Sequence, residues 1–303
     1  MIAIDLGSNS LRMIERNCET KAFTAEYEKI VKTAELLHSD GVISSGATER
    51  ILEGFKEASK ILDFTNQRCV AVTTEAMRRA SNATEVLAKI YAETGVQFEI
   101  IGAHKEAELT LFAVERRLDD LGFRGSFLLV DIGGGSTEII FKKGNISESK
   151  SFPVGIVTMA SKYPSQEEFD RHLPQELIEM NNYVQEYYKR EGKPDFFVAT
   201  AGTPTTIAAF KQGMTYDAYE AERINGSTLN YFECLRALDE LLELSDTERT
   251  RYVGVGREEL IVSGVMIYAS LFDLFKYESS VIIDDGLREG LAILACEDTL
   301  NLI

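Results

Sequence analysis

One short pattern that could bind phosphate occurs twice in this chain of 303 residues. Residues 4–10 read Ile-Asp-Leu-Gly-Ser-Asn-Ser, and residues 130–137 read Val-Asp-Ile-Gly-Gly-Gly-Ser-Thr. A hairpin whose tip consists of small residues lets backbone N–H groups close around a phosphate, and an Asp beside it can hold a hydrated cation. The two copies lie 126 residues apart, as Asp5 and Asp131 do. This duplication predicts two similar domains that bind one phosphorylated ligand between them.

The tips of these two hairpins supply the predicted phosphate ligands. Short hydroxyl and amide side chains, together with backbone N–H groups, reach phosphate oxygens without adding bulk. The residues are Ser8, Asn9, Ser10, Gly133, Gly134, Gly135 and Ser136. Gly202 and Thr203 form a third candidate, because they open a predicted helix whose N-terminus favours an anion. The alternative, a pair of ordinary hairpins, is disfavoured by the duplication.

Three carboxylates near the hairpins are candidate metal ligands. Asp131 and Glu138 flank the second hairpin, and Asp5 precedes the first. Mg²⁺ takes hard oxygen donors, typically one or two carboxylates together with waters and phosphates. The pattern therefore predicts a site for Mg²⁺ (or Mn²⁺) made by Asp131 and Glu138, with Asp5 assisting. Alternatively, the two Asp residues cap their own turns and Glu138 is a solvated strand residue.

The charge of the chain limits the classes of partner. A formal net charge of −17 argues against nonspecific binding to nucleic acid or to membrane surfaces, so neither is expected as a partner. It does not exclude a small anionic ligand, because repulsion is screened beyond about 8–10 Å. No stretch approaches the roughly 18 apolar residues of a membrane span, and no signal peptide precedes the first apolar segment. We therefore expect a cytoplasmic protein.

The four cysteines lie far apart in the sequence. They are Cys18, Cys69, Cys234 and Cys296, with no C-x-x-C pair and no neighbouring His. This spacing predicts reduced thiols that form neither disulfides nor a metal site.

The elements predicted around the motifs repeat in the two halves of the chain. Strand, hairpin, strand and third strand are followed by alternating helices and strands, which indicates an α/β fold. The predicted strands are 1–6, 11–16 and 22–32 in the first half and 127–131, 137–142 and 146–152 in the second. A polar, Gly-containing break at 119–125 predicts a boundary between domains 1–122 and 123–303, and a last helix over about 288–303 could pack back onto the first.

This order of elements is the plan of the actin, sugar-kinase and heat-shock ATPase superfamily, whose domains are ribonuclease H-like. Within it, the sequence resembles the exopolyphosphatase and guanosine pentaphosphate phosphohydrolase (Ppx/GppA) family. The matching segments are 3–10, 74–80 with 82–84, 100–102, 106–107, 130–138, 201–203 and 286–290. They span almost the whole chain in the family's order, and the length resembles short members that lack a further C-terminal helical region. The resemblance implies two similar actin-like domains with a cleft between them.

The resemblance also implies roles for two residues that composition and spacing do not assign. Glu106 matches the family's general base, which would take a proton from water. Lys105 replaces the first Glu of the family's pair, so Glu108 is kept as an alternative base, and a helix-start carboxylate favoured by the dipole is the structural alternative for Glu106. Arg78 matches a family Arg that would stabilise charge on the transferred phosphoryl group.

The implied reaction is hydrolysis of a phosphoanhydride. Water would attack the terminal phosphorus in line, with assistance from Mg²⁺, and release orthophosphate from inorganic polyphosphate. Guanosine pentaphosphate, a signal of the stringent response, would be hydrolysed to the tetraphosphate instead or as well. The resemblance also makes a homodimer plausible. Two alternatives remain: a small ATP-dependent kinase of the same superfamily, and a noncatalytic sensor of the alarmone or of polyphosphate. Phosphate release from polyphosphate without ADP formation from ATP distinguishes the hydrolase.

Overall fold

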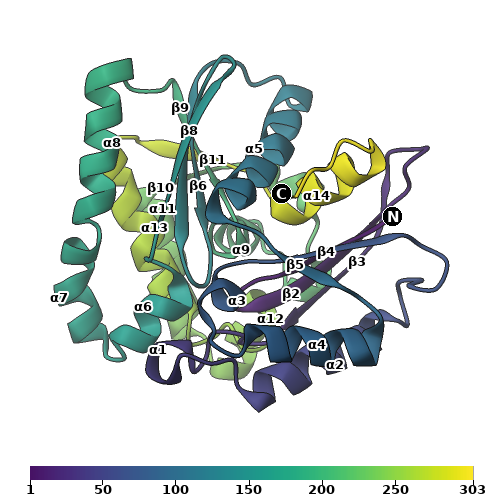
Figure 1. Ribbon diagram of the computed structural model, residues 1–303. Coiled ribbons are helices and arrows are strands. Elements are labelled where there is room, and N and C mark those ends of the chain that lie inside the picture. The colour runs from purple at the N-terminus through teal and green to yellow at the C-terminus, as the bar shows by residue number, and fades with distance from the viewer. Residues whose placement is uncertain (303) are drawn as a thin grey trace. The chain divides into compact units, whose positions relative to one another are not determined.

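The computed structural model describes residues 1–302 and divides into two compact units. Unit 1 comprises Met1–Ala113 together with the C-terminal residues from Asp285 onward, and unit 2 comprises Val114–Asp284. The division falls inside helix α5 (Ala103–Asp120), whereas the sequence suggested a boundary after residue 122. Each unit contains one sheet with helices packed on it (Figure 1).

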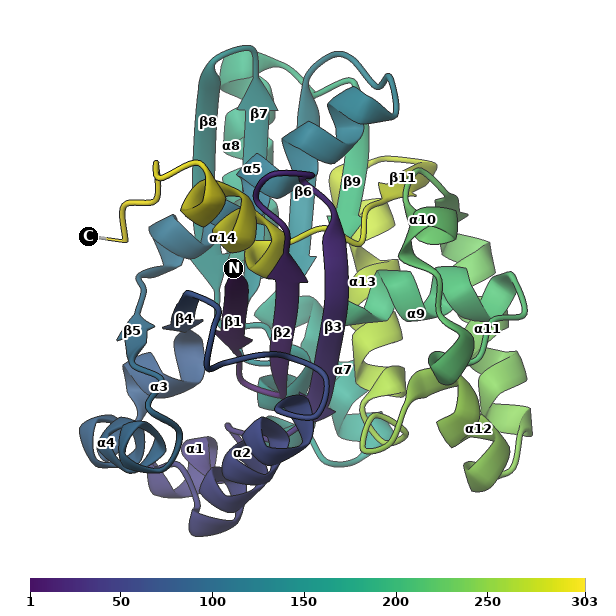
Figure 2. The same cartoon turned by 90° about the vertical axis from the view of Figure 1, so that its right-hand side faces the viewer.

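Unit 1 is built on a five-stranded sheet in the order β3-β2-β1-β4-β5 (Figure 2). The strands are β1 (Ile2–Leu6), β2 (Ser10–Arg16), β3 (Phe23–Ile30), β4 (Cys69–Thr73) and β5 (Phe98–Ile100). The first three strands are antiparallel, and β4 and β5 run parallel to β1. The predicted meander of three strands is therefore present, and the carboxyl ends of β1, β4 and β5 lie at one edge of the sheet.

The two faces of this sheet bind different helices, because successive strand residues point to opposite sides. The helices of unit 1 are α1 (Leu37–Asp40), α2 (Ser45–Ala58), α3 (Glu75–Arg79), α4 (Ala83–Thr94), the first part of α5, and α14 (Leu287–Cys296). Helix α2 packs on the face that carries Leu11, while α14 packs with Ala3 and Ile14 on the other. Gly290 lets α14 approach α5, since a Cβ there would lie 2.1 Å from the carbonyl oxygen of Leu109.

Unit 2 repeats the same strand order in a six-stranded sheet, β10-β11-β9-β6-β7-β8. The strands are β6 (Phe127–Ile132), β7 (Thr137–Lys143), β8 (Ile146–Phe152), β9 (Phe196–Thr200), β10 (Thr228–Asn230) and β11 (Ser279–Ile282). Strands β6, β7 and β8 form an antiparallel meander, and β9 and β11 extend the sheet in parallel with β6. The two units therefore have similar α/β topologies of the actin-like type, as the sequence predicted.

Unit 2 also contains many helices. They are α6 (Ile156–Lys162), α7 (Gln166–Glu176), α8 (Ile178–Glu191), α9 (Gly202–Lys211), a short 3-10 helix (Tyr216–Ala218), α10 (Ala221–Ile224), α11 (Tyr231–Glu243), α12 (Asp246–Val253) and α13 (Ile261–Phe275). Residues 166–191 form two consecutive helices, α7 and α8, that are separated at Leu177 (Figure 1). Pro174, which lacks a backbone N–H, precedes the break by three residues.

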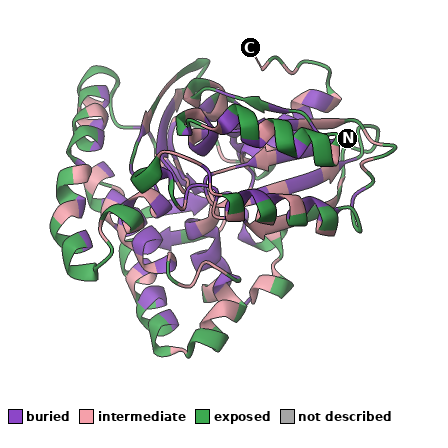
Figure 3. Ribbon diagram, turned by 60° about the horizontal axis from the view of Figure 1, so that its bottom comes forward, coloured by how far each residue is buried: buried purple, intermediate pink, exposed green. Residues whose placement is uncertain are grey.

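The cores follow the strands. Figure 3 shows buried residues along the sheets and exposed residues along the outer faces of the helices. In unit 2, Phe197 of β9 packs edge-on against Phe272 and Phe275 of α13. In the part of the chain that the structure describes, no helix has both the length and the apolarity to cross a membrane.

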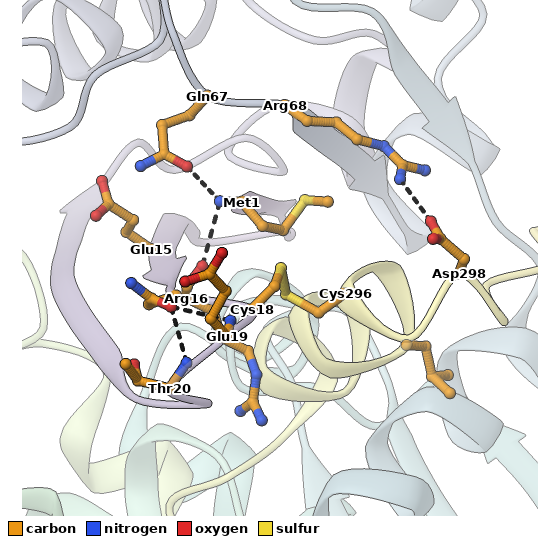
Figure 4. Close-up of a disulfide and its surroundings, with 12 residues drawn as sticks. Met1, Glu15, Arg16, Cys18, Glu19, Thr20, Gln67, Arg68, Cys296 and Asp298 are labelled. Atoms are coloured by element: carbon orange, nitrogen blue, oxygen red, sulfur yellow. Dashed lines mark hydrogen bonds and ion pairs between the residues drawn. A yellow bond between two sulfur atoms is a disulfide. The ribbon is translucent and has the colours of Figure 1, made fainter.

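The prediction of four reduced cysteines is wrong for two of them. Cys18, just after β2, and Cys296, at the end of α14, form a disulfide with their Cα atoms 5.2 Å apart (Figure 4). Cys69 and Cys234 are free. The pair was missed because its members are 278 residues apart in sequence and only the folding of α14 onto β2 brings them together. Near the bridge, Arg68 pairs with Asp298 at 3.0 Å and further ties the C-terminal segment to unit 1.

Candidate active site

The first hairpin is closed by its own backbone and held from outside through its carbonyl groups. The N–H of Gly7 donates to the carbonyl of Ser10 at 3.0 Å. The carbonyl of Asn9 accepts from the N–H groups of Val31 and Lys32, both at 2.9 Å. The carbonyl of Ser8 accepts from a residue of the same segment, Ala34, also at 2.9 Å. The segment after β3 thus fixes the tip of the hairpin.

The second hairpin is held in the same way. The N–H of Gly133 donates to the carbonyl of Ser136 at 2.9 Å, and the carbonyl of Gly134 accepts from Val157 at 2.8 Å and from Thr158 at 3.1 Å. Val157 and Thr158 follow Val31 and Lys32 by the same 126 residues that separate the hairpins. The duplication seen in the motif therefore extends to the segment that supports it.

This support leaves the amide groups of the tips available. Within residues 1–302, the backbone N–H groups of Ser8, Asn9, Gly134 and Gly135 donate to no acceptor of the protein. A tip whose carbonyls are bonded and whose amides are not presents partial positive charge, which suits an anion. Both hairpins have this property, and both were predicted to bind phosphate.

Gly155 explains how the supporting segment comes so close to the second hairpin. A Cβ at this position would lie 2.2 Å from the carbonyl carbon of Gly135 and 2.4 Å from the carbonyl oxygen of Gly134. Backbone therefore packs directly on backbone here, and a larger residue would move the hairpin. Gly155 was not identified from the sequence, and the internal repeat gives no signal for it, because the position 126 residues earlier is Lys29.

Asp131 and Glu138 lie opposite each other on neighbouring strands of unit 2. They are paired in the β6–β7 ladder, and Thr200 and Ser151 extend the same row on β9 and β8. Glu138 is buried at 3% exposure, and its Oε1 accepts hydrogen bonds at 2.7 Å from the hydroxyls of both Ser136 and Ser151. The two carboxylates predicted to hold a metal are thus cross-strand neighbours, and Ser151 was given no role from the sequence.

Gly202 and Thr203 begin α9 beside this row. Strand β9 runs parallel to β6, with Thr200 level with Asp131, so the turn that follows lies at the same sheet edge as the second hairpin. Ala201 adopts a left-handed backbone with φ 74° as it turns the chain into the helix. Thr203 is buried, and a Cβ on Gly264 of α13 would lie 2.3 Å from its hydroxyl oxygen. Asp131, Glu138, Ser136 and this helix start thus belong to one edge of unit 2.

In unit 1, Glu106 and Arg78 are in direct contact. They lie in elements that follow β5 and β4, and the parallel pairing of these strands with β1 brings them to the edge that carries Asp5 and the first hairpin. Nη1 of Arg78 lies 2.9 Å from Oε2 of Glu106 and donates at 2.7 Å to the carbonyl of Ile101. Nη2 of the same guanidinium lies 3.1 Å from Oε2 of Glu75.

The two candidates for the general base differ in their surroundings. The side chain of Glu106 is 13% exposed and held by Arg78, whereas that of Glu108 is 50% exposed and paired with Lys105 at 2.8 Å. Burial alone would lower the pKa of Arg78, but the charge and hydrogen bond of Glu106, together with Glu75, raise it above its ordinary value. Arg78 is therefore a permanent cation beside Glu106. Glu75 was not identified from the sequence, although it stands three residues before Arg78 on the same short helix.

Comparison with known proteins identifies the family of the chain. The sequence profile of the Ppx/GppA phosphatase family matches residues 17–297. The chain is 26% identical to the bifunctional 3-dehydroquinate synthase/phosphatase of Fusobacterium nucleatum, over 98% of this chain and 46% of that protein, so it spans about half the length of that relative. It is 25% identical to Exopolyphosphatase 1 of Mycobacterium leprae, over 96% of this chain and 87% of that protein.

Solved structures agree with the sequence comparison. The crystal structure of the Aquifex aeolicus member of the Ppx/GppA family is similar over 99% of this chain and 98% of its own chain. The sequence identity is 28% and the TM-score is 0.72. An exopolyphosphatase from Cytophaga hutchinsonii shares the fold with a TM-score of 0.82 at 19% identity. Because the family profile and these relatives extend over nearly its whole length, the chain belongs to the Ppx/GppA phosphatase family.

Proposed function

We propose that this protein is an exopolyphosphatase that releases orthophosphate from the end of inorganic polyphosphate. The observation that carries the proposal is the pair of hairpins with bonded carbonyls and available amides, one in each unit. We propose that Ser8, Asn9 and Ser10 in the first, and residues 133–136 in the second, each bind phosphate. The start of α9, at Gly202 and Thr203, is proposed to add a further anion site.

Glu106 is proposed as the general base. It would take the proton as water attacks the terminal phosphorus; the new P–O bond forms as the anhydride bond breaks, giving orthophosphate and a chain shorter by one phosphate. The partly buried ion pair with Arg78 supports this role over that of Glu108, because it holds the carboxylate in one position. Arg78 is proposed to offset the negative charge of the phosphoryl group while it is transferred to water.

The residues around the second hairpin fit a divalent cation. Asp131 and Glu138 lie directly opposite each other on neighbouring strands, so two carboxylates are close together on one side of the sheet. Within residues 1–302 no three His, Cys, Asp or Glu side chains form a ready-made metal cluster, but Mg²⁺ needs only one or two carboxylates with waters and phosphates. We propose that Asp131 and Glu138 hold Mg²⁺ (or Mn²⁺), with Asp5 assisting. The ion would neutralise phosphate charge.

Guanosine pentaphosphate is the second candidate substrate, because its terminal phosphoanhydride would present the same group to the hairpins. The similarity to Exopolyphosphatase 1 of Mycobacterium leprae supports polyphosphate as the first substrate to test.

The proposal is tested by incubating the protein with Mg²⁺ and, separately, with polyphosphate, guanosine pentaphosphate or ATP, and measuring the phosphate released. We expect turnover of long-chain polyphosphate and no ADP from ATP. Turnover of guanosine pentaphosphate alone would assign the alarmone as substrate. ATP-dependent phosphorylation of a second substrate, or binding of polyphosphate without any turnover, would contradict the hydrolase and favour a kinase or a sensor.

A further inference from the structure

We infer that Glu75 is a positioning residue, which acts on the candidate base Glu106 through Arg78. The inference rests on the proposed role of Glu106 as the general base. It assigns a function to a carboxylate that lies outside both hairpins and outside the proposed metal site.

The three side chains form a partly buried row in unit 1. Arg78 stands between the two carboxylates, with Nη1 2.9 Å from Oε2 of Glu106 and Nη2 3.1 Å from Oε2 of Glu75. The side chains of Glu75 and Arg78 are each 18% exposed, and that of Glu106 is 13% exposed. Partly buried ion pairs are screened less than fully exposed pairs, so each partner affects the next.

The backbone fixes the row at both ends. Glu75 and Arg78 share one face of the short helix α3, three residues apart, and the N–H of Arg78 donates to the carbonyl of Thr74 at 3.0 Å. At the other end, Nη1 of Arg78 also donates to the carbonyl of Ile101, in the turn that leads into α5. Glu75 keeps one nitrogen of the guanidinium on α3, so that the other remains directed at Ile101 and Glu106.

The charges of the row set the strength of the base. Arg78 favours the ionised form of Glu106 and lowers its pKa, whereas the negative charge of Glu75 favours the protonated form and raises it. The two carboxylates therefore share Arg78, while the exposed Arg79 lies 3.5 Å from the other oxygen of Glu75. Without Glu75, Arg78 would neutralise Glu106 more completely, and the base would bind a proton less strongly.

The test compares the pH dependence of kcat/KM for polyphosphate in Glu75→Gln and in the wild type, at saturating Mg²⁺. We expect kcat to fall about 10-fold with KM unchanged, because the base is weaker and less well held. We also expect the acidic limb of the kcat/KM–pH profile to move to lower pH, because removing the negative charge of Glu75 lowers the pKa of Glu106. Arg78→Gln should move the same limb to higher pH. Glu93→Gln, on the exposed last turn of α4, changes the net charge equally and should move neither kcat nor the limb.

A purely structural role for Glu75 would lower activity without moving the limb, and that result would overturn the inference, as would wild-type kinetics in Glu75→Gln. The proposed function is tested separately in the same series. If the wild type does not hydrolyse polyphosphate, or if Glu106→Gln stays active, the proposed function fails. Titration of the ¹³C-labelled Glu106 carboxyl by NMR, assigned by its loss in Glu106→Gln, reads the effect of Glu75 without turnover: a lower pKa in Glu75→Gln supports the inference, and an unchanged pKa refutes it.

Discussion

Replacement of Gly155 by Ala tests the claim that the second hairpin is held by direct backbone packing. The backbone of Gly155 is extended, with φ −106° and ψ 159°, so Ala can adopt it without strain and the effect is steric alone. The new Cβ would begin 2.2 Å from the carbonyl carbon of Gly135, against about 3.4 Å for ordinary contact. The hairpin or its supporting segment must therefore move by about 1.2 Å, a distance obtained as the difference of these two values.

A shift of this size has two measurable consequences. Misplacement of a reacting group by 1 Å can cost about 100-fold in rate, so we expect kcat/KM for polyphosphate to fall by about that factor. Overpacking of this kind costs about 1–3 kcal/mol of stability, so we expect a lower melting temperature but a folded protein.

The assay is phosphate release beside a thermal melt, with Gly102→Ala as the matched control. A Cβ on Gly102 would meet nothing within 4 Å, so the same substitution there should leave both measurements near the wild type. Wild-type kcat/KM together with a wild-type melting temperature in Gly155→Ala would refute the described packing of the hairpin.

Three further predictions concern the disulfide, the partly exposed ion pair of Glu35 with Arg50, and the metal site. Replacing Cys18 and Cys296 by Ser should remove about 3–5 kcal/mol of stability, because the bridge closes a loop of nearly the whole chain; urea denaturation should show this loss, and reduced wild type should behave like the variant. Burial would raise the pKa of Glu35, but hydrogen bonds from Arg50 and Ser44 lower it. Its stabilisation is therefore present above the unfolded pKa of about 4.3 and is lost as pH falls through the folded pKa; Glu35→Gln should be less stable than wild type at pH 7, and denaturant melts at lower pH should show the gap closing. Glu138→Gln should lower kcat/KM at least about 10-fold and raise the Mg²⁺ concentration needed for half-maximal activity; an unchanged Mg²⁺ requirement would remove Glu138 from the metal site.

Local patterns in the sequence were sufficient to predict the hairpins and the strands around them. The side-chain alternation of β1 and β2 and the small residues at the tips are features of a few consecutive residues, and they repeat after 126 positions. The break between α7 and α8 falls at Leu177, three residues after Pro174, which lies inside α7.

The features that sequence reasoning missed depend on long-range contact. Glu75 acts only because two parallel strands bring α3 beside the start of α5, and the bond between Cys18 and Cys296 exists only because α14 packs on the first sheet. Ser151 reaches Glu138 across the β7–β8 ladder, whose register no single strand encodes. Each of these pairs a residue of unremarkable local pattern with one far along the chain.

The most direct measurement of the central claim is the rate of phosphate release from polyphosphate by Glu106→Gln and Glu108→Gln, each compared with the wild type. General base catalysis contributes about 10²–10⁴-fold, so Glu106→Gln should lose activity by that factor while its melt shows a folded protein. Glu108→Gln should retain the wild-type rate, because this side chain is half exposed and paired with Lys105. A fully active Glu106→Gln beside an inactive Glu108→Gln would contradict the account and move the chemistry to the other carboxylate.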